Sequence, residues 1–183
     1  AAPVFIQSFE VANLKELNGM TDISIVQLIN AGGRPWDFTV AGDSRTYADM
    51  ASAAGLDEIA TYADGVGVNK TLMIPRNGDG TLGDPTSVIA NAHAEGLIVH
   101  GWTFRRENTF LPTDYREGSD PNAYGDLEGE ILAFFAAGMD GVFSDQPDIG
   151  VAAVASIPEP QTYALMLGGL GILGAVARRR ARR

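Results

Sequence analysis

Four side chains that could hold a ligand lie in or just after short apolar runs of the sequence. They are Gln7 in VFIQSF (4–9), Gln27 in ISIVQLI (23–29), Lys70 after GVGV (65–68) and Trp102 in LIVHGWTF (97–104). A lysine ammonium is a compact cation that could pair with a phosphate. The glutamine amides could hydrogen-bond to ligand oxygens, and the indole could form an apolar wall. These four are therefore the candidate ligand-binding residues.

The elements that must position these residues alternate between strand and helix. The predicted strands cover 4–9, 23–29, 65–68, 97–104 and 141–145. The predicted helices cover 13–18, 45–63, 86–95, 126–138 and 149–156, with Asp84 as N-cap of the third and a break allowed at Gly55 in the second. Residues 30–43, rich in glycine and proline, are predicted to form a loop. Strands separated by helices pair in parallel through right-handed crossovers.

This alternation fits either part of a (β/α)8 barrel or an open doubly wound sheet. No glycine-rich phosphate-binding fingerprint follows any strand, which favours the barrel. A complete barrel needs about 250 residues, and residues 1–156 fall well short of that length. The predicted fold class is therefore α/β, a partial TIM (β/α)8 barrel. In such a barrel the active site lies at the carboxyl ends of the strands, where the four candidates fall.

Histidines and cysteines give little sign of further chemistry. A general acid or base must reach the reacting atoms within hydrogen-bond distance. His93 falls inside a predicted outer helix and His100 in the middle of a strand, so we predict a surface role for the first and a packing role for the second. Asp145 is expected to cap the turn that follows it. The absence of cysteine excludes disulfides, thiolate metal sites and a cysteine nucleophile.

The charge distribution is uneven. Five of the 13 basic residues and one of the 23 acidic residues lie beyond Ser156, which leaves 8 basic and 22 acidic residues before it and a formal charge of −14. A body with this charge repels nucleic acid, so no nucleic-acid partner is expected.

Four segments, in order, resemble the C-terminal part of glycerophosphodiester phosphodiesterases. They are VFIQSFEVANLKEL, YADGVGVNKTLMIP, AHAEGLIVHGWTFRREN and GMDGVFSDQPD. The resemblance implies a TIM barrel that hydrolyses glycerophosphodiesters to glycerol 3-phosphate and an alcohol with the help of a divalent metal, calcium or magnesium. It also implies that Trp102 would lie near the glycerol or alcohol group.

The family's first motifs are missing from this sequence. Its His-Arg-Gly motif, Glu-x-Asp pair, second catalytic histidine and Glu-x-Lys motif would all precede the QSF strand, and none is present. The expectation is therefore that residues 1–156 are the C-terminal half of the barrel and carry neither a catalytic nor a metal-binding residue. Such a fragment is expected to be inactive alone.

The last residues form a second unit, 157–183. Pro158, Glu159 and Pro160 precede an uncharged stretch, 163–177, and five terminal arginines. As a helix this stretch would span about 22 Å, short of the roughly 30 Å hydrocarbon core, although arginine stems can extend it, so a short membrane-spanning helix is predicted. The order of parts resembles the PEP-CTERM sorting signal. That resemblance implies export to the envelope or surface of a Gram-negative bacterium, membrane anchoring and cleavage by an exosortase.

A non-enzymatic alternative stays open. The sorting tail is also compatible with a non-catalytic, surface-displayed barrel that acts as a binding or extracellular-matrix protein. Turnover of a glycerophosphodiester that a chelator abolishes would separate the two hypotheses.

Overall fold

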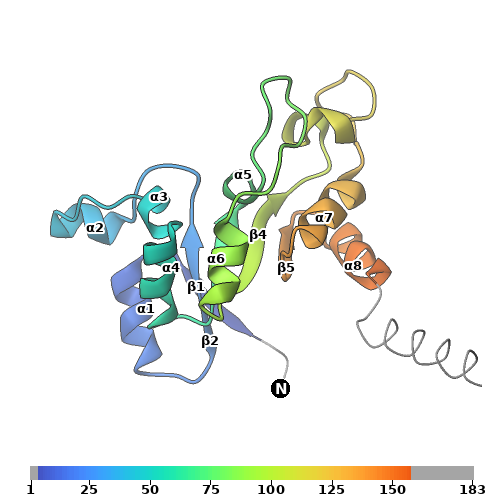
Figure 1. The fold of residues 1–183 in the computed structure, drawn as a ribbon. Coiled ribbons are helices and arrows are strands. Elements are labelled where there is room, and N and C mark those ends of the chain that lie inside the picture. Colours follow the sequence, from blue (N-terminus) through green and yellow to red (C-terminus); the bar gives the residue numbers. More distant parts are fainter. Residues whose placement is uncertain (1–3, 158–183) are drawn as a thin grey trace, which may run out of the picture.

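Residues 4–157 are described by the computed structural model, and their centre is one sheet of five parallel strands (Figure 1). The strands are β1 (Phe5–Ser8), β2 (Ser24–Ile29), β3 (Gly65–Asn69), β4 (Ile98–Phe104) and β5 (Gly141–Ser144). Their order in the sheet is their order in the sequence, and each neighbouring pair is parallel. Successive βα units that add strands in one direction build a half-barrel, so the predicted partial barrel is confirmed.

The helices connect successive strands and follow the last. They are α1 (Val11–Asn18), α2 (Trp36–Ala41), α3 (Tyr47–Met50), α4 (Ala53–Ala60), α5 (Lys70–Met73), α6 (Val88–Ala94), α7 (Leu127–Ala136) and α8 (Pro147–Ser156). Two 3-10 turns, η1 (Asn108–Phe110) and η2 (Thr113–Tyr115), lie in the long connection between β4 and α7. The predicted strands and the helices at 13–18, 126–138 and 149–156 are thus confirmed, with boundaries that shift by a few residues.

The predicted loop 30–43 is partly wrong, because it contains α2. The Glu10 carboxylate accepts hydrogen bonds from the backbone N–H groups of Trp36 (3.2 Å) and Asp37 (2.6 Å). It thereby satisfies two of the N–H groups that a helix start leaves unpaired. Because Glu10 lies far from α2 in the sequence, the residues around the start of this helix could not predict the cap.

Two other helix boundaries also differ from the prediction. The segment 45–63 breaks at Ser52, whose hydroxyl caps α4 by accepting from the Gly55 N–H (3.2 Å), and not at Gly55 itself. Gly55 is required for close packing, since a Cβ there would lie 2.3 Å from the Asp49 carbonyl oxygen. The predicted N-cap at Asp84 is wrong, because α6 begins after Ser87. The Thr86 N–H donates instead to the Met73 carbonyl oxygen (2.8 Å), so the helix starts later in the sequence.

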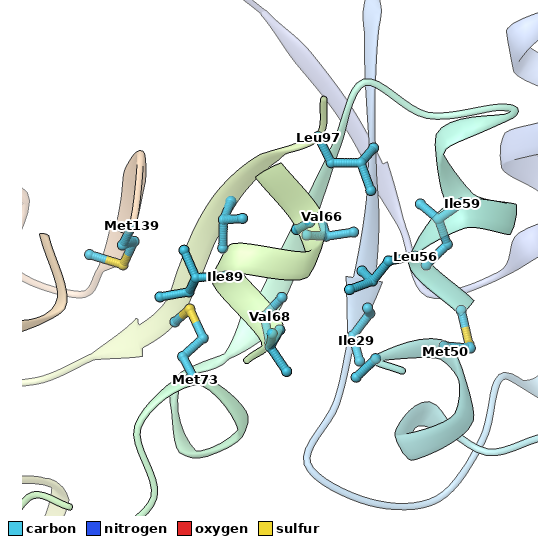
Figure 2. Packing of buried hydrophobic residues seen from close by; sticks show 14 of the residues in the cluster. Ile29, Met50, Leu56, Ile59, Val66, Val68, Met73, Ile89, Leu97 and Met139 are labelled. Atoms are coloured by element: carbon cyan, nitrogen blue, oxygen red, sulfur yellow. The ribbon is translucent and has the colours of Figure 1, made fainter. Parts of the chain in front are cut away.

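The hydrophobic core lies between the sheet and the helices. Val66 and Val68 project from β3 into this layer, where Leu56 and Ile59 of α4 and Ile89 of α6 pack, as Figure 2 shows. Because strand side chains alternate, the next residues along β3 face the other way. On that other, concave side there is no room for a larger residue at Gly67, since a Cβ there would lie 2.5 Å from Leu28 Cδ2.

The predicted membrane-spanning segment, 163–177, lies outside the described residues. Within residues 4–157, no helix is both long and apolar enough to cross a bilayer.

The two outer strands predict how these 183 residues behave when expressed by themselves. In the described part of the chain β1 pairs only with β2 and β5 only with β4, so each has an unpaired backbone edge. Unpaired edges recruit other strands. We expect the isolated chain to self-associate, as measured by light scattering after size-exclusion chromatography across a tenfold concentration range. A monomer that unfolds in one cooperative transition at every concentration would contradict this prediction.

Candidate functional site

The carboxyl ends of the five parallel strands meet at one rim, the barrel mouth, and two cavities open there. The larger, of about 900 Å³, is lined mainly by apolar side chains, including Phe9, Leu28 and Phe143, and extends along α8. The smaller, of about 500 Å³, lies between the segment 69–76 and the segment 102–110. Trp102 and Thr103 line both cavities, so the site has two adjoining compartments.

Trp102 is held in place where the sequence predicted a wall. Its indole Nε1 donates a hydrogen bond to the Gly67 carbonyl oxygen on the neighbouring strand at 2.7 Å. Its ring meets Phe9 edge to face, with 5.7 Å between centroids. With the polar N–H satisfied, the rest of the indole offers an apolar surface to a ligand. Gln7 also lines the larger cavity and is exposed there, in agreement with its predicted position.

Gln27 has a different place from the one predicted for it. It lies on the helix-facing side of β2, like Ile25 and Ile29, and is fully buried. Its Oε1 accepts from the Tyr62 hydroxyl at 2.9 Å, and its Nε2 lies within 3.3 Å of three backbone carbonyl oxygens. Both ends of its amide thus have hydrogen-bond partners within the chain. The placement supports a packing role and gives no support to the predicted contact with substrate oxygens.

Lys70 lies at the end of β3 as predicted, but its ammonium is already paired. Nζ lies 2.7 and 2.9 Å from the two carboxylate oxygens of Glu130 on α7, and 3.2 Å from the Phe110 carbonyl oxygen. These contacts use its three donors. Lys70 and Glu130 are both buried, and the ammonium lies 5.1 Å from the Phe104 ring centroid. The predicted pairing with a phosphate would require this lysine to give up an internal partner.

Burial dominates the electrostatics of the Lys70–Glu130 pair. It lowers the pKa of Lys70 and raises the pKa of Glu130, because the interior disfavours both charged forms, while the attraction between the two groups opposes each shift. A buried pair of this kind contributes little net stability, but removing one partner leaves an uncompensated charge. The pair therefore fixes the rim at the end of β3 and joins it to α7.

The two histidines behave as the sequence predicted. His100 lies on the concave side between Phe5 (centroids 5.0 Å apart) and Phe143 (5.5 Å), and burial lowers its pKa. His93 is half-exposed, with Nε2 2.8 Å from the Asp140 carboxylate. Neither histidine lines the two mouth cavities.

Asp145 does not cap the turn that follows it, so that prediction is wrong. The Gln146 N–H bonds to the Ser144 hydroxyl instead (3.1 Å). Asp145 turns to Arg105, and its Oδ2 lies 2.6 Å from the Arg105 Nε.

Sequence reasoning missed three charged residues at the mouth. Arg76 and Arg105 line the smaller cavity, and Glu130 holds Lys70. Glu130 could have been noticed as a lone acid on the apolar face of LEGEILAFFA, alongside Leu127, Ile131 and Phe134. Arg105 follows β4 directly, the position from which barrels draw site residues.

The described residues give no fit to a metal ion. Across residues 4–157, no group of three or more histidine, aspartate or glutamate side chains lies together in a way that could hold one. The groups that line the mouth in this part of the chain are a fixed indole, an amide and guanidinium groups.

Breaking the buried pair should cost far more stability than breaking an exposed one. Lys70→Met leaves Glu130 buried without its counter-ion, and we expect a loss of about 3–5 kcal/mol in the free energy of unfolding. The double variant Lys70→Met/Glu130→Leu should recover most of this loss. Lys15→Met, which breaks the exposed contact to Glu58 at 3.0 Å, is the control and should cost less than about 1 kcal/mol.

Denaturant unfolding of the natural protein, with all four chains compared in one buffer, measures these differences. A double variant that is no more stable than Lys70→Met would show that removing the second charge relieves nothing and would refute the pairing.

Comparison with known proteins gives two matches along the chain. The Glycerophosphoryl diester phosphodiesterase family matches residues 1–149, and the PEP-CTERM protein-sorting motif matches residues 156–183. The glycerophosphodiester phosphodiesterase GDPD6 of Arabidopsis thaliana is 35% identical over 145 residues, which are 78% of this chain and 35% of that protein. A second Arabidopsis thaliana protein of that name, GDPDL1, is 32% identical over 114 residues, 61% of this chain and 14% of its own length.

Two solved structures whose titles name glycerophosphoryl diester phosphodiesterases match part of this chain. One from Silicibacter pomeroyi gives a TM-score of 0.49 at 17% identity and covers 82% of this chain and 37% of its own. One from Agrobacterium tumefaciens gives 0.43 at 17% identity and covers 80% and 41%. The chain thus spans about a third of the length of the first curated relative and well under half of either solved chain.

Proposed function

Since the chain belongs to the glycerophosphoryl diester phosphodiesterase family, we propose that the natural protein containing it hydrolyses glycerophosphodiesters to glycerol 3-phosphate and an alcohol. The observation that carries this proposal is the family match over residues 1–149, which spans the five strands of the described sheet, the smaller mouth cavity and most of the lining of the larger one. The proposal is supported by the position of the candidate residues Gln7 and Trp102 at the carboxyl ends of the strands, where barrel enzymes bind their substrates.

The contribution of this chain is to bind and orient the substrate. Trp102, held by its bond to the Gly67 carbonyl, would pack against the glycerol or alcohol part. Gln7, which lines the same cavity, could hydrogen-bond to a substrate oxygen. Holding a substrate in one orientation lowers the barrier to its reaction, because less freedom is lost in the transition state.

A divalent metal, calcium or magnesium, belongs to the proposal as a requirement of the whole reaction. Such an ion would polarise the phosphate and stabilise developing charge. Residues 4–157 do not fit such an ion, because no three histidine, aspartate or glutamate side chains among them lie together in a way that could hold it. Neither His93 nor His100 lines the mouth cavities, so neither is proposed as the general acid or base.

The sorting motif supports a proposal about location. We infer export to the cell envelope or surface of a Gram-negative bacterium, with residues 163–177 as a membrane anchor and an exosortase as processing partner. Pro158, Glu159 and Pro160 would be the motif that the processing enzyme reads. Prolines favour extended backbone, which suits recognition by a protease-like enzyme.

A non-catalytic binding or matrix barrel is the second candidate. One observation favours it: the described half of the mouth combines an apolar cavity with arginines but brings no histidine or metal cage to them. Such a protein would bind glycerophosphodiesters or similar ligands without turning them over.

Activity of the natural protein separates the two candidates. With calcium or magnesium we expect it to release glycerol 3-phosphate from glycerophosphocholine, and a chelator should abolish the release. Trp102→Ala should lower kcat/KM about ten- to hundredfold, because about 1.5–3 kcal/mol of apolar contact is lost. Trp36→Ala is the control, since that indole on α2 is 69% exposed. Absence of turnover with every metal tested would favour the binding barrel.

The processing proposal has its own test. Replacing Pro158, Glu159 and Pro160 together by alanine should leave the protein uncleaved in the membrane fraction of an exosortase-containing host, as seen by blotting and intact mass. The control is an exosortase-deficient strain carrying the unchanged sequence, which should accumulate the same species. Equal processing of the altered and unaltered proteins would overturn the assignment.

A further inference from the structure

The smaller mouth cavity is cationic in a strongly acidic protein. Arg76, Arg105 and Lys70 line it together with hydroxyl groups, and we call it the arginine cavity; its hydroxyl-bearing residues are Thr71, Thr103 and Thr109. Residues before Ile157 carry a formal charge of −14, and three of their eight basic side chains line this one cavity. Such a concentration points to a ligand of negative charge.

Arg76 contributes a positive charge without a carboxylate partner. Its terminal nitrogen donates to the Phe110 carbonyl oxygen. Within the described range, no carboxylate oxygen lies within the 4.0 Å that defines an ion pair with it. Burial lowers the pKa of Arg76, yet a guanidinium keeps its charge at neutral pH. The carbonyl contact fixes the group at the cavity wall and leaves other N–H donors for a ligand.

Arg105 faces Arg76 from the opposite segment. Its guanidinium carbon lies 4.7 Å from the Phe110 ring centroid, which supports the side chain from one side. Its Nε is 2.6 Å from Asp145 Oδ2, but this buried Nε–H does not point along the contact and has no hydrogen-bond partner in the described residues. The contact is thus an ion pair without a proper hydrogen bond. Asp145 offsets the charge of Arg105 and leaves its terminal donors available.

The acidic groups near the cavity are engaged elsewhere or act on Arg76 only at a distance. Glu130 is paired with Lys70 and Asp145 with Arg105, while Glu130 and Asp114 attract Arg76 without a direct contact, so Arg76 is the basic residue of this cavity without a carboxylate partner in the described residues. A phosphate oxygen suits such a place, because guanidinium groups bind phosphate through paired charge-assisted hydrogen bonds. The threonine hydroxyls can donate as well.

The arginine cavity shares Trp102 and Thr103 with the larger cavity, so one ligand can occupy both. Resting on the proposed function, we propose that the arginine cavity binds a second phosphate group, carried on the alcohol part of a doubly anionic glycerophosphodiester. The protein would then prefer glycerophosphodiesters whose alcohol bears a phosphate over those whose alcohol is neutral or cationic.

Substrates that differ in one phosphate group test this preference in the natural protein. Glycerophosphoinositol 4-phosphate carries the second phosphate, and glycerophosphoinositol lacks it. We expect Arg76→Gln to lower kcat/KM for glycerophosphoinositol 4-phosphate about ten- to hundredfold, mostly by raising KM, because hydrogen bonds to a charged group are lost. The kcat/KM for glycerophosphoinositol should change less than about twofold. Lys15→Gln removes one positive charge from α1 and should change neither.

Three results would overturn the proposal. Arg76→Gln could lower kcat/KM equally for both substrates, which would mean that the arginine binds the hydrolysed phosphate or stabilises the fold. Arg76→Gln could leave both kcat/KM values unchanged. Lys15→Gln could also lower kcat/KM for the doubly anionic substrate alone, which would attribute the preference to overall charge. A thermal melt of each variant shows whether a general loss of structure explains an equal decrease.

A binding measurement keeps this inference separate from the proposed function. If the natural protein turns over no glycerophosphodiester, the proposed function fails, and calorimetric titration with inorganic phosphate decides the anion site alone. Phosphate binding that Arg76→Gln weakens at least tenfold while Lys15→Gln leaves it unchanged supports the site. Equal phosphate binding by the unaltered protein and Arg76→Gln, or no binding at all, overturns it.

Discussion

The alternation of side chains along parallel strands is the constraint on which this site depends. Each strand must give every second residue to the helix layer, because that layer holds the core, and only the remaining residues can face the barrel interior. Val66 and Val68 therefore go to the core, and Gly67 between them faces inward. A side chain at Gly67 would strike Leu28, so its small size keeps the concave side open and its carbonyl within reach of the Trp102 indole.

The same alternation explains which site residues could be predicted from sequence. Trp102 and Gln7, both candidates from the sequence, line the larger mouth cavity because they fall toward the carboxyl ends of strands and on the inward register. Gln27 also lies toward the carboxyl end of its strand, but its side chain points to the same side of the sheet as Ile25 and Ile29. It therefore belongs to the core. Counting register from the β-branched core residues would have separated these glutamines, whereas residue type alone could not.

Other features depend on contacts that no local pattern contains. The start of α2 is fixed by Glu10, more than 20 positions earlier, and the ammonium of Lys70 is held by Glu130, 60 positions later. Strand and helix identity was predictable because apolar periodicity and glycine ends are local. The pairing of buried charges was not, since it is decided by which loops the barrel brings together at its rim.

Phe110 connects the charged residues of the rim into one unit. Its carbonyl oxygen accepts from both Lys70 and Arg76, and its ring supports the Arg105 guanidinium. Glu130 on α7 joins this unit to the helix layer through its ion pair with Lys70. The two walls of the arginine cavity, one after β3 and one after β4, are thus tied through a single residue of η1. The buried Lys70–Glu130 pair adds little net stability, but it can still fix the positions of the neighbouring arginines Arg76 and Arg105.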